Sequence, residues 1–392
     1  MQLIYSNFDK LEITFQGILP EKILNQLAGA REQAQNEKRE VPMEIGRSKK
    51  TVLVAETGAR GGYRYRFDTG PDGETWLISH STNSETWGIR VTVKSLSLAL
   101  YGYEECKRRI LNYLDDWEAT GLSRHDENGT VINTPLERIS RFDYCFDFII
   151  PHDFYPMPNN FVAHRRTKIQ IMGKDDSEIS KMQTLSGGKI ETLTLGKSPG
   201  RQATLYNKSK EIKSSLKREW WQIWNLDPNN FKDKAKNIWR VEVRAGKKEL
   251  DKWGFKRFKD FEEKAGDVTA SILKAMRYTI PLKDDLNRSR WPMHPIWKEA
   301  LNESFKVLKP YSSNAIRENI VDGMREEKLQ IYRRQIIGCL ISMTALKGLD
   351  MSEIPAAMLS IEKSIEELAK EDKDGLIGKF QKAKDKFRLL EN

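Results

Sequence analysis

The run Ser140-Arg-Phe-Asp-Tyr-Cys-Phe-Asp-Phe148 alternates aromatic residues with polar or small ones, which predicts a β-strand with two contrasting faces. Because side chains in a strand alternate with a period of two, one face carries Arg141, Asp143, Cys145 and Asp147. The aromatic face can pack in a core. The two carboxylates, about 7 Å apart on the other face, must be solvated, paired or bound to a metal. A solvent-facing stripe with an Arg–Asp pair explains them as well as a functional site does.

A second strand is predicted in Trp239-Arg-Val-Glu-Val-Arg244, where Arg240, Glu242 and Arg244 share one face. A carboxylate between two guanidinium groups suits phosphate chemistry with a metal, because oxygen ligands bind Mg²⁺ or Mn²⁺ and arginine binds phosphate. An ordinary amphipathic strand has the same pattern, so this segment alone does not decide between the two.

A hairpin is predicted over residues 189–208, with a turn at 197–200. Pairing Gly196 with Arg201 across this turn places Glu191 opposite Tyr206, with Lys208 on the same face. A slip of one residue would reverse the faces. A phenol beside a carboxylate and an ammonium group can become a nucleophile, although most strand tyrosines are simply packed.

The rest of the chain predicts an α+β fold. Leu11–Phe15 and Ile89–Val93 alternate like strands, and Glu104–Trp117 has helical spacing with Gly121 as its expected C-cap. A helix packed on one face of a sheet leaves the other face free for a ligand. The pattern after about residue 290 is helical, so we expect one domain over residues 1–299 and a helical C-terminal subdomain over residues 300–392.

Composition favours a polyanionic partner. The 392 residues include 66 Lys and Arg against 56 Asp and Glu, a formal net charge of +10. A basic but otherwise ordinary enzyme is the alternative. Residues 213–260 hold five of the ten tryptophans among many lysines, which suggests a basic surface with stacking rings for single-stranded DNA. Core packing is the other interpretation, and we favour it for at least half of these tryptophans.

Several classes of protein are disfavoured. No uncharged apolar run is long enough to span a membrane, and the N-terminus lacks the pattern of a secretory signal. Three scattered cysteines do not form a disulfide framework or a thiolate metal site, so we expect a cytoplasmic location. The five histidines lack the spacing of a zinc hydrolase, and Gly196-Lys-Ser198 lacks the earlier glycine of an ATP-binding loop.

Four motifs in order resemble the replication initiation factor family, the trans-acting Rep proteins of rolling-circle plasmids with relatives among relaxases of integrative elements and filamentous phages. They are Arg141–Asp147, Glu191–Ser198, Leu205-Tyr-Asn-Lys-Ser-Lys-Glu211 and Trp239–Arg244. Weaker likenesses extend the resemblance over roughly residues 9–300. The resemblance implies an antiparallel sheet of the HUH-endonuclease type, in which carboxylates largely replace the histidine pair.

The resemblance also implies roles for residues. Tyr206 matches the tyrosine of the family's Ile-Tyr-Asp/Asn-Lys-x-x-Glu motif and is the expected nucleophile, with Lys208 as a second catalytic residue. Mg²⁺ or Mn²⁺ is expected, bound first by Asp143 and Glu242 and next by Asp147 and Glu191. The expected DNA contacts are Arg141, Lys197, Arg201, Arg240 and Arg244. The family's Gly-Ser-Arg-x-Ser turn is replaced here by Gly196-Lys-Ser-Pro-Gly200, which alters the expected phosphate contacts.

We therefore expect residues 1–299 to nick one DNA strand at an origin through a tyrosine, leaving a 5′-phosphotyrosine and a free 3′-OH, and to rejoin the strand later. A relaxase of an integrative element would use the same chemistry, whereas a non-catalytic origin-binding protein would keep the fold without nicking. The expected partners are origin DNA as duplex and single strand, a host helicase and a second copy of the chain. No membrane partner is expected.

Overall fold

The computed structural model describes residues 1–70, 72–125, 128–163, 185–186, 189–215, 219–227, 229–307 and 317–387. The chain divides into two compact units. The first comprises Met1–Asp251 with Phe255–Asn314, and the second comprises Lys252–Gly254 with Ala315–Asn392.

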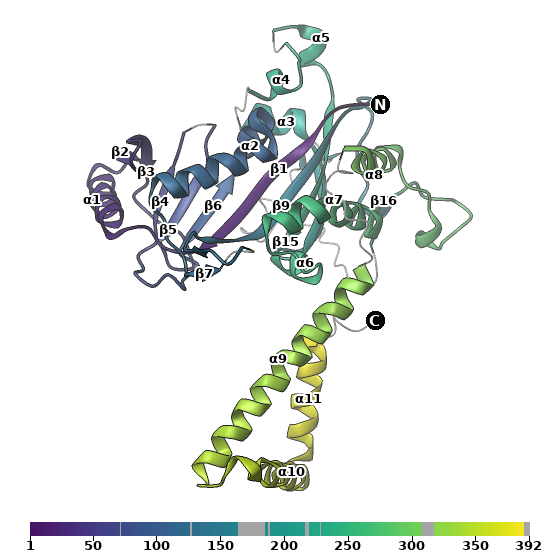
Figure 1. Ribbon diagram of the computed structural model, residues 1–392. Helices are drawn as coiled ribbons and strands as arrows, with labels where there is room; N and C mark the ends of the chain where they lie inside the picture. Colours follow the sequence, from purple (N-terminus) through teal and green to yellow (C-terminus); the bar gives the residue numbers. More distant parts are fainter. Residues whose placement is uncertain are drawn as a thin grey trace. The chain divides into compact units, whose positions relative to one another are not determined.

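The first unit is built on a ten-stranded antiparallel sheet in the order β13-β14-β15-β9-β1-β6-β5-β4-β3-β2 (Figure 1). Its strands are β1 (Gln2–Gln16), β2 (Val41–Ile45), β3 (Lys50–Val54), β4 (Tyr63–Asp68), β5 (Thr75–Ser79), β6 (Ile89–Val93), β9 (Leu136–Ile149), β13 (Thr192–Gly196), β14 (Arg201–Asn207) and β15 (Ile238–Gly246). The two longest strands, β1 and β9, pair with each other in the middle of the sheet. The expected α+β class, its antiparallel sheet and its helical C-terminal region are confirmed.

One face of the central strands is apolar. Helices α2 (Ser95–Asp116) and α7 (Phe258–Ala275) cover this face (Figure 1). Phe8 of β1 packs against both the sheet and the two helices that cover it. Its ring lies 6.0 Å from Phe142 of β9, 4.8 Å from Phe261 of α7 and 6.4 Å from Tyr103 of α2. Burial of such rings is the main stabilising contribution of this layer. The period-two pattern of β9 therefore predicted correctly which face enters the core.

Helix α2 differs from the predicted Glu104–Trp117 helix at both ends. It begins at Ser95 and continues through Gly102, whose φ of 70° interrupts the helical conformation. It ends where Trp117 caps it and Glu118 takes a positive φ of 54°, so Gly121 is not the C-cap. Gly102 can interrupt the helix from within because a positive φ costs glycine little.

The remaining elements of the first unit are short or peripheral. The helices are α1 (Glu21–Glu37), α3 (Lys208–Ser214), α4 (Glu219–Ile223), α5 (Phe231–Lys234), α6 (Lys247–Lys252) and α8 (Pro295–Val307). Three two-stranded sheets pair β7 (Arg124–His125) with β8 (Val131–Ile132), β10 (Phe161–Ala163) with β16 (Met276–Tyr278), and β11 (Leu185–Ser186) with β12 (Lys189–Ile190).

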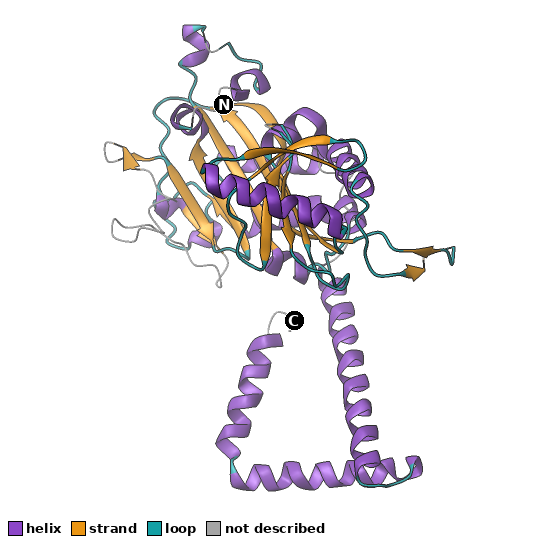
Figure 2. Cartoon of the chain, turned by 90° about the vertical axis from the view of Figure 1, so that its left-hand side faces the viewer, coloured by secondary structure: helices purple, strands orange, loops and turns teal. Residues whose placement is uncertain are grey.

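The second unit is helical. It contains α9 (Arg317–Leu346), α10 (Ile354–Glu371) and α11 (Lys373–Phe387), joined by short connections (Figure 2). Within the described part of the chain, no helix combines the length and apolar character needed to cross a membrane.

The five tryptophans of the 213–260 region correct one expectation. Trp220, Trp221, Trp224, Trp239 and Trp253 are all buried. The first three form a cluster with Ile212 and Ile238, against which Tyr5 of β1 packs. These rings are core residues, so this region does not offer them as a stacking surface for DNA.

Candidate active site

The polar face of the sheet, opposite α2 and α7, carries a pocket of about 660 Å³. Residues of β1, β6, β9, β13, β14, β15 and α3, together with the first residues of α2, line it, and Tyr206, Lys208, Glu242, Arg244, Asp143 and Arg141 are among them. Six residues predicted for the site from separate motifs therefore meet in one pocket. Pairing of β14 with β15 and of β15 with β9 brings them together.

The predicted hairpin register is wrong by one residue. Gly196 pairs with Gln202, and Thr192 rather than Glu191 lies opposite Tyr206. Residues 197–201 separate the paired positions, one more than the predicted turn 197–200. The slip turns Glu191 away from the tyrosine, as expected for a strand with a side-chain period of two.

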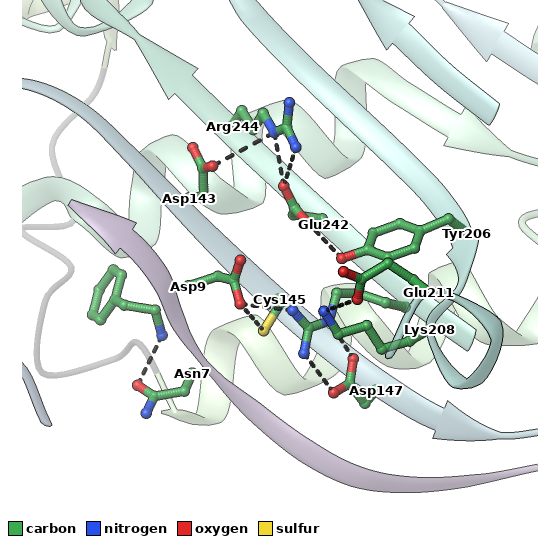
Figure 3. Close-up of polar contacts among 12 residues, drawn as sticks. Asn7, Asp9, Asp143, Cys145, Asp147, Tyr206, Lys208, Glu211, Glu242 and Arg244 are labelled. Atoms are coloured by element: carbon green, nitrogen blue, oxygen red, sulfur yellow. Dashed lines mark hydrogen bonds and ion pairs between the residues drawn. The ribbon is translucent and has the colours of Figure 1, made fainter. Parts of the chain in front are cut away.

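Tyr206 is held by a hydrogen bond to a paired carboxylate (Figure 3). Its hydroxyl donates to Glu242 Oε2 at 3.0 Å, and Arg244 donates to Glu242 Oε1 at 2.7 Å. Burial raises the pKa of Tyr206 well above its usual value, and the charge of Glu242 raises it further while Arg240 opposes this. Burial also favours a higher pKa for Glu242, but Arg244 and Arg240 outweigh this effect and hold the pKa at about 2. The resting pair is a neutral phenol on an ionised carboxylate.

Asp143 continues this chain of contacts on β9. Arg141 Nε donates to Asp143 Oδ1 at 2.8 Å, and Arg244 Nε lies 3.5 Å from Asp143 Oδ2. Burial raises the pKa of Asp143 to about 6, opposed by the Arg141 hydrogen bond and reinforced by the nearby charge of Glu242. The side chains of Arg141 and Arg244 remain 26% and 30% exposed, so both guanidinium groups can reach a ligand.

Lys208 and Glu211 come from the short helix that follows the tyrosine. The side chain of Asn207 accepts from the backbone N–H of Lys210 and thereby caps α3 directly after β14. One helical turn then brings Lys208 Nζ to 2.6 Å from Glu211 Oε2. The same ammonium group lies 5.7 Å from the centre of the Tyr206 ring. Burial lowers the pKa of Lys208, assisted by the charge of Arg240.

The adjoining end of the polar face is sealed. Arg240 Nε donates to Asp147 Oδ1 at 2.6 Å, and Arg240 Nη1 donates to Asp9 Oδ1 at 2.6 Å. Trp224 Nε1 donates to Asp147 Oδ2, and the Trp220 ring lies 4.3 Å from the Arg240 guanidinium. Arg240 and Asp147 are both 0% exposed. Arg240 therefore stabilises the fold and does not reach the surface as the predicted DNA contact.

The other predicted residues lie away from this pocket. Glu191 pairs with Lys210 at 2.5 Å. Lys197 is exposed in the turn, and Arg201 starts β14 on the face opposite Tyr206. The structure therefore brings six of the eleven predicted residues into the pocket lining. Asp147, Glu191, Lys197, Arg201 and Arg240 do not line it, although Arg240 is buried directly opposite Tyr206 in the β14–β15 pairing.

Sequence reasoning gave no role to Glu211, although this residue ends the Leu205–Glu211 motif, and it did not identify Asp9. Glu211 follows Lys208 by three residues, a helical spacing that could have indicated their contact. Asp9 lies in β1, 231 positions before its partner Arg240, and no local signal connects them. Thr192, Thr194 and Thr204 also line the pocket beside Tyr206 and depend on the corrected register.

The four predicted metal ligands do not form one donor set. Asp143 and Glu242 are each paired with arginine, Asp147 is enclosed by Arg240 and Trp224, and Glu191 binds Lys210. In the ranges that the structure describes, no three His, Cys, Asp or Glu side chains gather in a way that would hold a metal ion. The described donors therefore do not fit a preformed Mg²⁺ or Mn²⁺ site.

No family model matches the chain. It is 26% identical over 196 residues to a protein of Pseudomonas phage Pf1 described as uncharacterized protein ORF430. The match covers 48% of this chain and 43% of the phage protein, so the chain spans less than half of that relative's length. Among solved structures, the rolling circle replication initiator protein from Geobacillus stearothermophilus matches 76% of this chain and 96% of its own, with 14% identity and a TM-score of 0.37.

Proposed function

We propose that this chain is a rolling-circle replication initiator that nicks one strand of origin DNA with Tyr206 and later rejoins it. The observation that carries the proposal is the Tyr206–Glu242–Arg244 contact in a pocket on the polar face of the sheet. The order of the four motifs along the chain supports the same conclusion. A phenol alone is a poor nucleophile at neutral pH, so it needs a proton acceptor and nearby positive charge.

In the proposed reaction, the Tyr206 oxygen attacks the scissile phosphorus and the bond from phosphorus to the 3′-oxygen breaks. The phenolic proton passes to Glu242, which already accepts the hydrogen bond. The departing 3′-oxygen takes a proton from solvent, giving a 5′-phosphotyrosine and a free 3′-OH. Since the covalent bond preserves the phosphodiester energy, the reverse attack by a 3′-OH rejoins the strand without ATP.

Glu242 must become more basic when DNA binds. Arg244 holds its pKa near 2 in the DNA-free protein. A phosphate group competes for the same guanidinium, because charge-assisted bonds from arginine to phosphate are strong and often bidentate. When Arg244 turns to the phosphate, the proton affinity of Glu242 rises. Arg141 and Lys208 then add positive charge beside the negatively charged transition state.

The resemblance also implies Mg²⁺ or Mn²⁺. The steps above use protein groups alone, because the described donors do not fit a preformed metal site. The metal requirement therefore stays a prediction of the resemblance. Loss of nicking in excess EDTA would support it, and full nicking would overturn it.

We further propose that residues 1–299 carry DNA binding and nicking, in a cytoplasmic protein, with 300–392 serving a separate role. A host helicase and a second copy of the chain are the proposed protein partners. A relaxase of an integrative element would share the chemistry and differ only in biological setting.

The Tyr206→Phe variant separates the enzyme from a non-catalytic origin-binding protein. Supercoiled plasmid carrying the chain's own replicon is incubated with the wild type and the variant, and both nicking and origin binding are measured. We expect nicking to vanish in the variant while binding persists. An unchanged nicking rate would reject Tyr206 as the nucleophile, and no nicking by the wild type despite tight binding would favour the non-catalytic protein.

A further inference from the structure

A second pocket, of about 540 Å³, lies on the same polar face and shares Arg141 with the candidate active site. Residues of β1, β6 and β9, which also contribute to the candidate active site, form its floor. Thr14 of β1 pairs with Arg90 of β6 on one side and with Arg138 of β9 on the other. Arg138 and Asp143 are five residues apart on β9, about 17 Å along a strand. The two pockets therefore adjoin one another at Arg141, and we call them the flanking pocket and the active-site pocket.

The flanking pocket is rich in positive charge. Arg90, Arg138, Arg141 and Lys247 line it, and Glu12 is its acidic lining residue. Glu12 pairs with Arg90 Nη2, and Asp251 pairs with Arg138 Nη2 at 2.7 Å, while the Nε–H groups of both arginines are buried and have no acceptor among the described residues. Their side chains are 34% and 31% exposed. Part of each arginine side chain therefore remains accessible to an anion in the pocket.

Two aromatic rings lie beside these arginines. Tyr63 of β4 and Trp87 line the flanking pocket, and the Tyr63 hydroxyl donates to the Trp87 carbonyl at 3.2 Å. Both are partly exposed, and neither ring stacks on another within the described chain. Eight of the ten tryptophans are buried, so only Trp87 and Trp291 keep part of their surface available.

We propose that the flanking pocket binds a nucleotide of the single strand next to the scissile phosphate, with its base stacked on Trp87 beside Tyr63 and its phosphate on Arg90 and Arg138. Flat rings and cations together match the two chemical parts of a nucleotide. Stacking requires an unpaired base, so the ligand is single-stranded DNA rather than duplex. The proposal depends on the proposed function in one respect: it takes the bound strand to be the DNA that reaches Tyr206.

The test compares two fluorescent 20-mers of equal charge, oligo-dT and a fully abasic strand. The wild type should bind oligo-dT more tightly, and Trp87→Ala should lose about five- to 150-fold of that preference, as for removal of one base–aromatic stack. Trp87→Phe should retain most of the preference. Trp291→Ala is the matched control, because Trp291 lies outside the flanking pocket, and it should stay within about twofold of the wild type.

Arg90→Met should weaken the binding of both 20-mers by the same factor. It should also reduce the slope of log affinity against log salt by about 0.7, the value for one phosphate contact on a single strand. An unchanged preference in Trp87→Ala would overturn the proposal, as would an equal loss in Trp87→Phe. Because the test measures binding without cleavage, the flanking pocket can stand even where nicking by Tyr206 fails, and it can fail while nicking stands.

Discussion

Two arginine–carboxylate groups lie on the same face of the sheet and have different roles. In the sealed group, Arg240 of β15 binds Asp147 beneath Trp220 and Trp224, and its second partner, Asp9, reaches the active-site pocket. In the open group, Arg141 and Arg244 bind Asp143 and Glu242 beside Tyr206. Both groups use β9 and β15 and the same types of side chain. What separates them is the tryptophan cover, which leaves one group to stabilise the fold and the other to meet a ligand.

The largest expected effect is Arg240→Met in the sealed group. Removing one partner of a buried ion pair leaves charges without compensation, which typically costs about 3–5 kcal/mol. We expect the free energy of unfolding in urea, followed by circular dichroism, to fall by that amount. Arg244→Met is the comparison variant and should cost less than Arg240→Met, because the Arg244 side chain is 30% exposed and Asp143 keeps Arg141 as a second partner, although Glu242 is buried. Equal losses would contradict the distinction between the two groups.

The next effect is a pH dependence of stability that comes from Asp143. Its pKa is about 6 in the fold against 3.8 ordinarily, so the folded protein binds the extra proton and this stabilisation is lost as pH rises from about 4 to about 6. The difference corresponds to about 3 kcal/mol. The stability of the wild type relative to Asp143→Asn should therefore fall by about 2–3 kcal/mol over this range.

Glu242→Gln provides a contrast, because the pKa of Glu242 is lowered and its stabilisation disappears only as pH falls below about 4.5 toward 2. The measurement is urea unfolding at several pH values. A flat difference between the wild type and Asp143→Asn from pH 4 to 6 would contradict the burial of the Asp143 charge.

A smaller effect is expected on DNA affinity. Arg141→Met removes one exposed guanidinium from the boundary of the two pockets and should weaken single-stranded DNA binding by about tenfold, the value of one charge-assisted contact. Fluorescence anisotropy measures it. Lys232→Met removes an exposed cation outside both pockets and should leave the affinity within about twofold. Similar losses in both variants would indicate general charge attraction instead of a site.

The smallest effect concerns metal. Because Asp143 and Glu242 are paired with arginines, Mn²⁺ added to the DNA-free protein should raise its melting temperature by less than about 1 °C. Differential scanning fluorimetry checks this. A rise of several degrees that Glu242→Gln abolishes would show that the carboxylates release their arginines for a metal ion.

The two groups also show what the sequence could reveal. Strand periodicity alone places Asp143 on the same face as Asp147, and Glu242 on the same face as Arg240. Periodicity does not tell which end of that face is covered. The cover comes from Trp220 and Trp224, whose packing against β1 is a contact between distant segments.

The hairpin shows a second limit. The turn signals located the reversal at Gly196–Gly200, but they did not fix the number of unpaired residues, and one extra residue moved Glu191 away from Tyr206. Asp9 and the flanking pocket depend on the neighbours that β1 acquires in the sheet, which a local pattern does not specify.

The most direct test of the central claim is mass spectrometry of the covalent adduct. The wild-type chain is incubated with single-stranded oligonucleotides from its own replicon and Mn²⁺, digested, and searched for a peptide that carries a 5′-phosphodeoxynucleotide. We predict the adduct on Tyr206 and none in the Tyr206→Phe variant. Nicked DNA with the adduct on another residue, or nicked DNA with no covalent adduct at all, would contradict Tyr206 as the nucleophile.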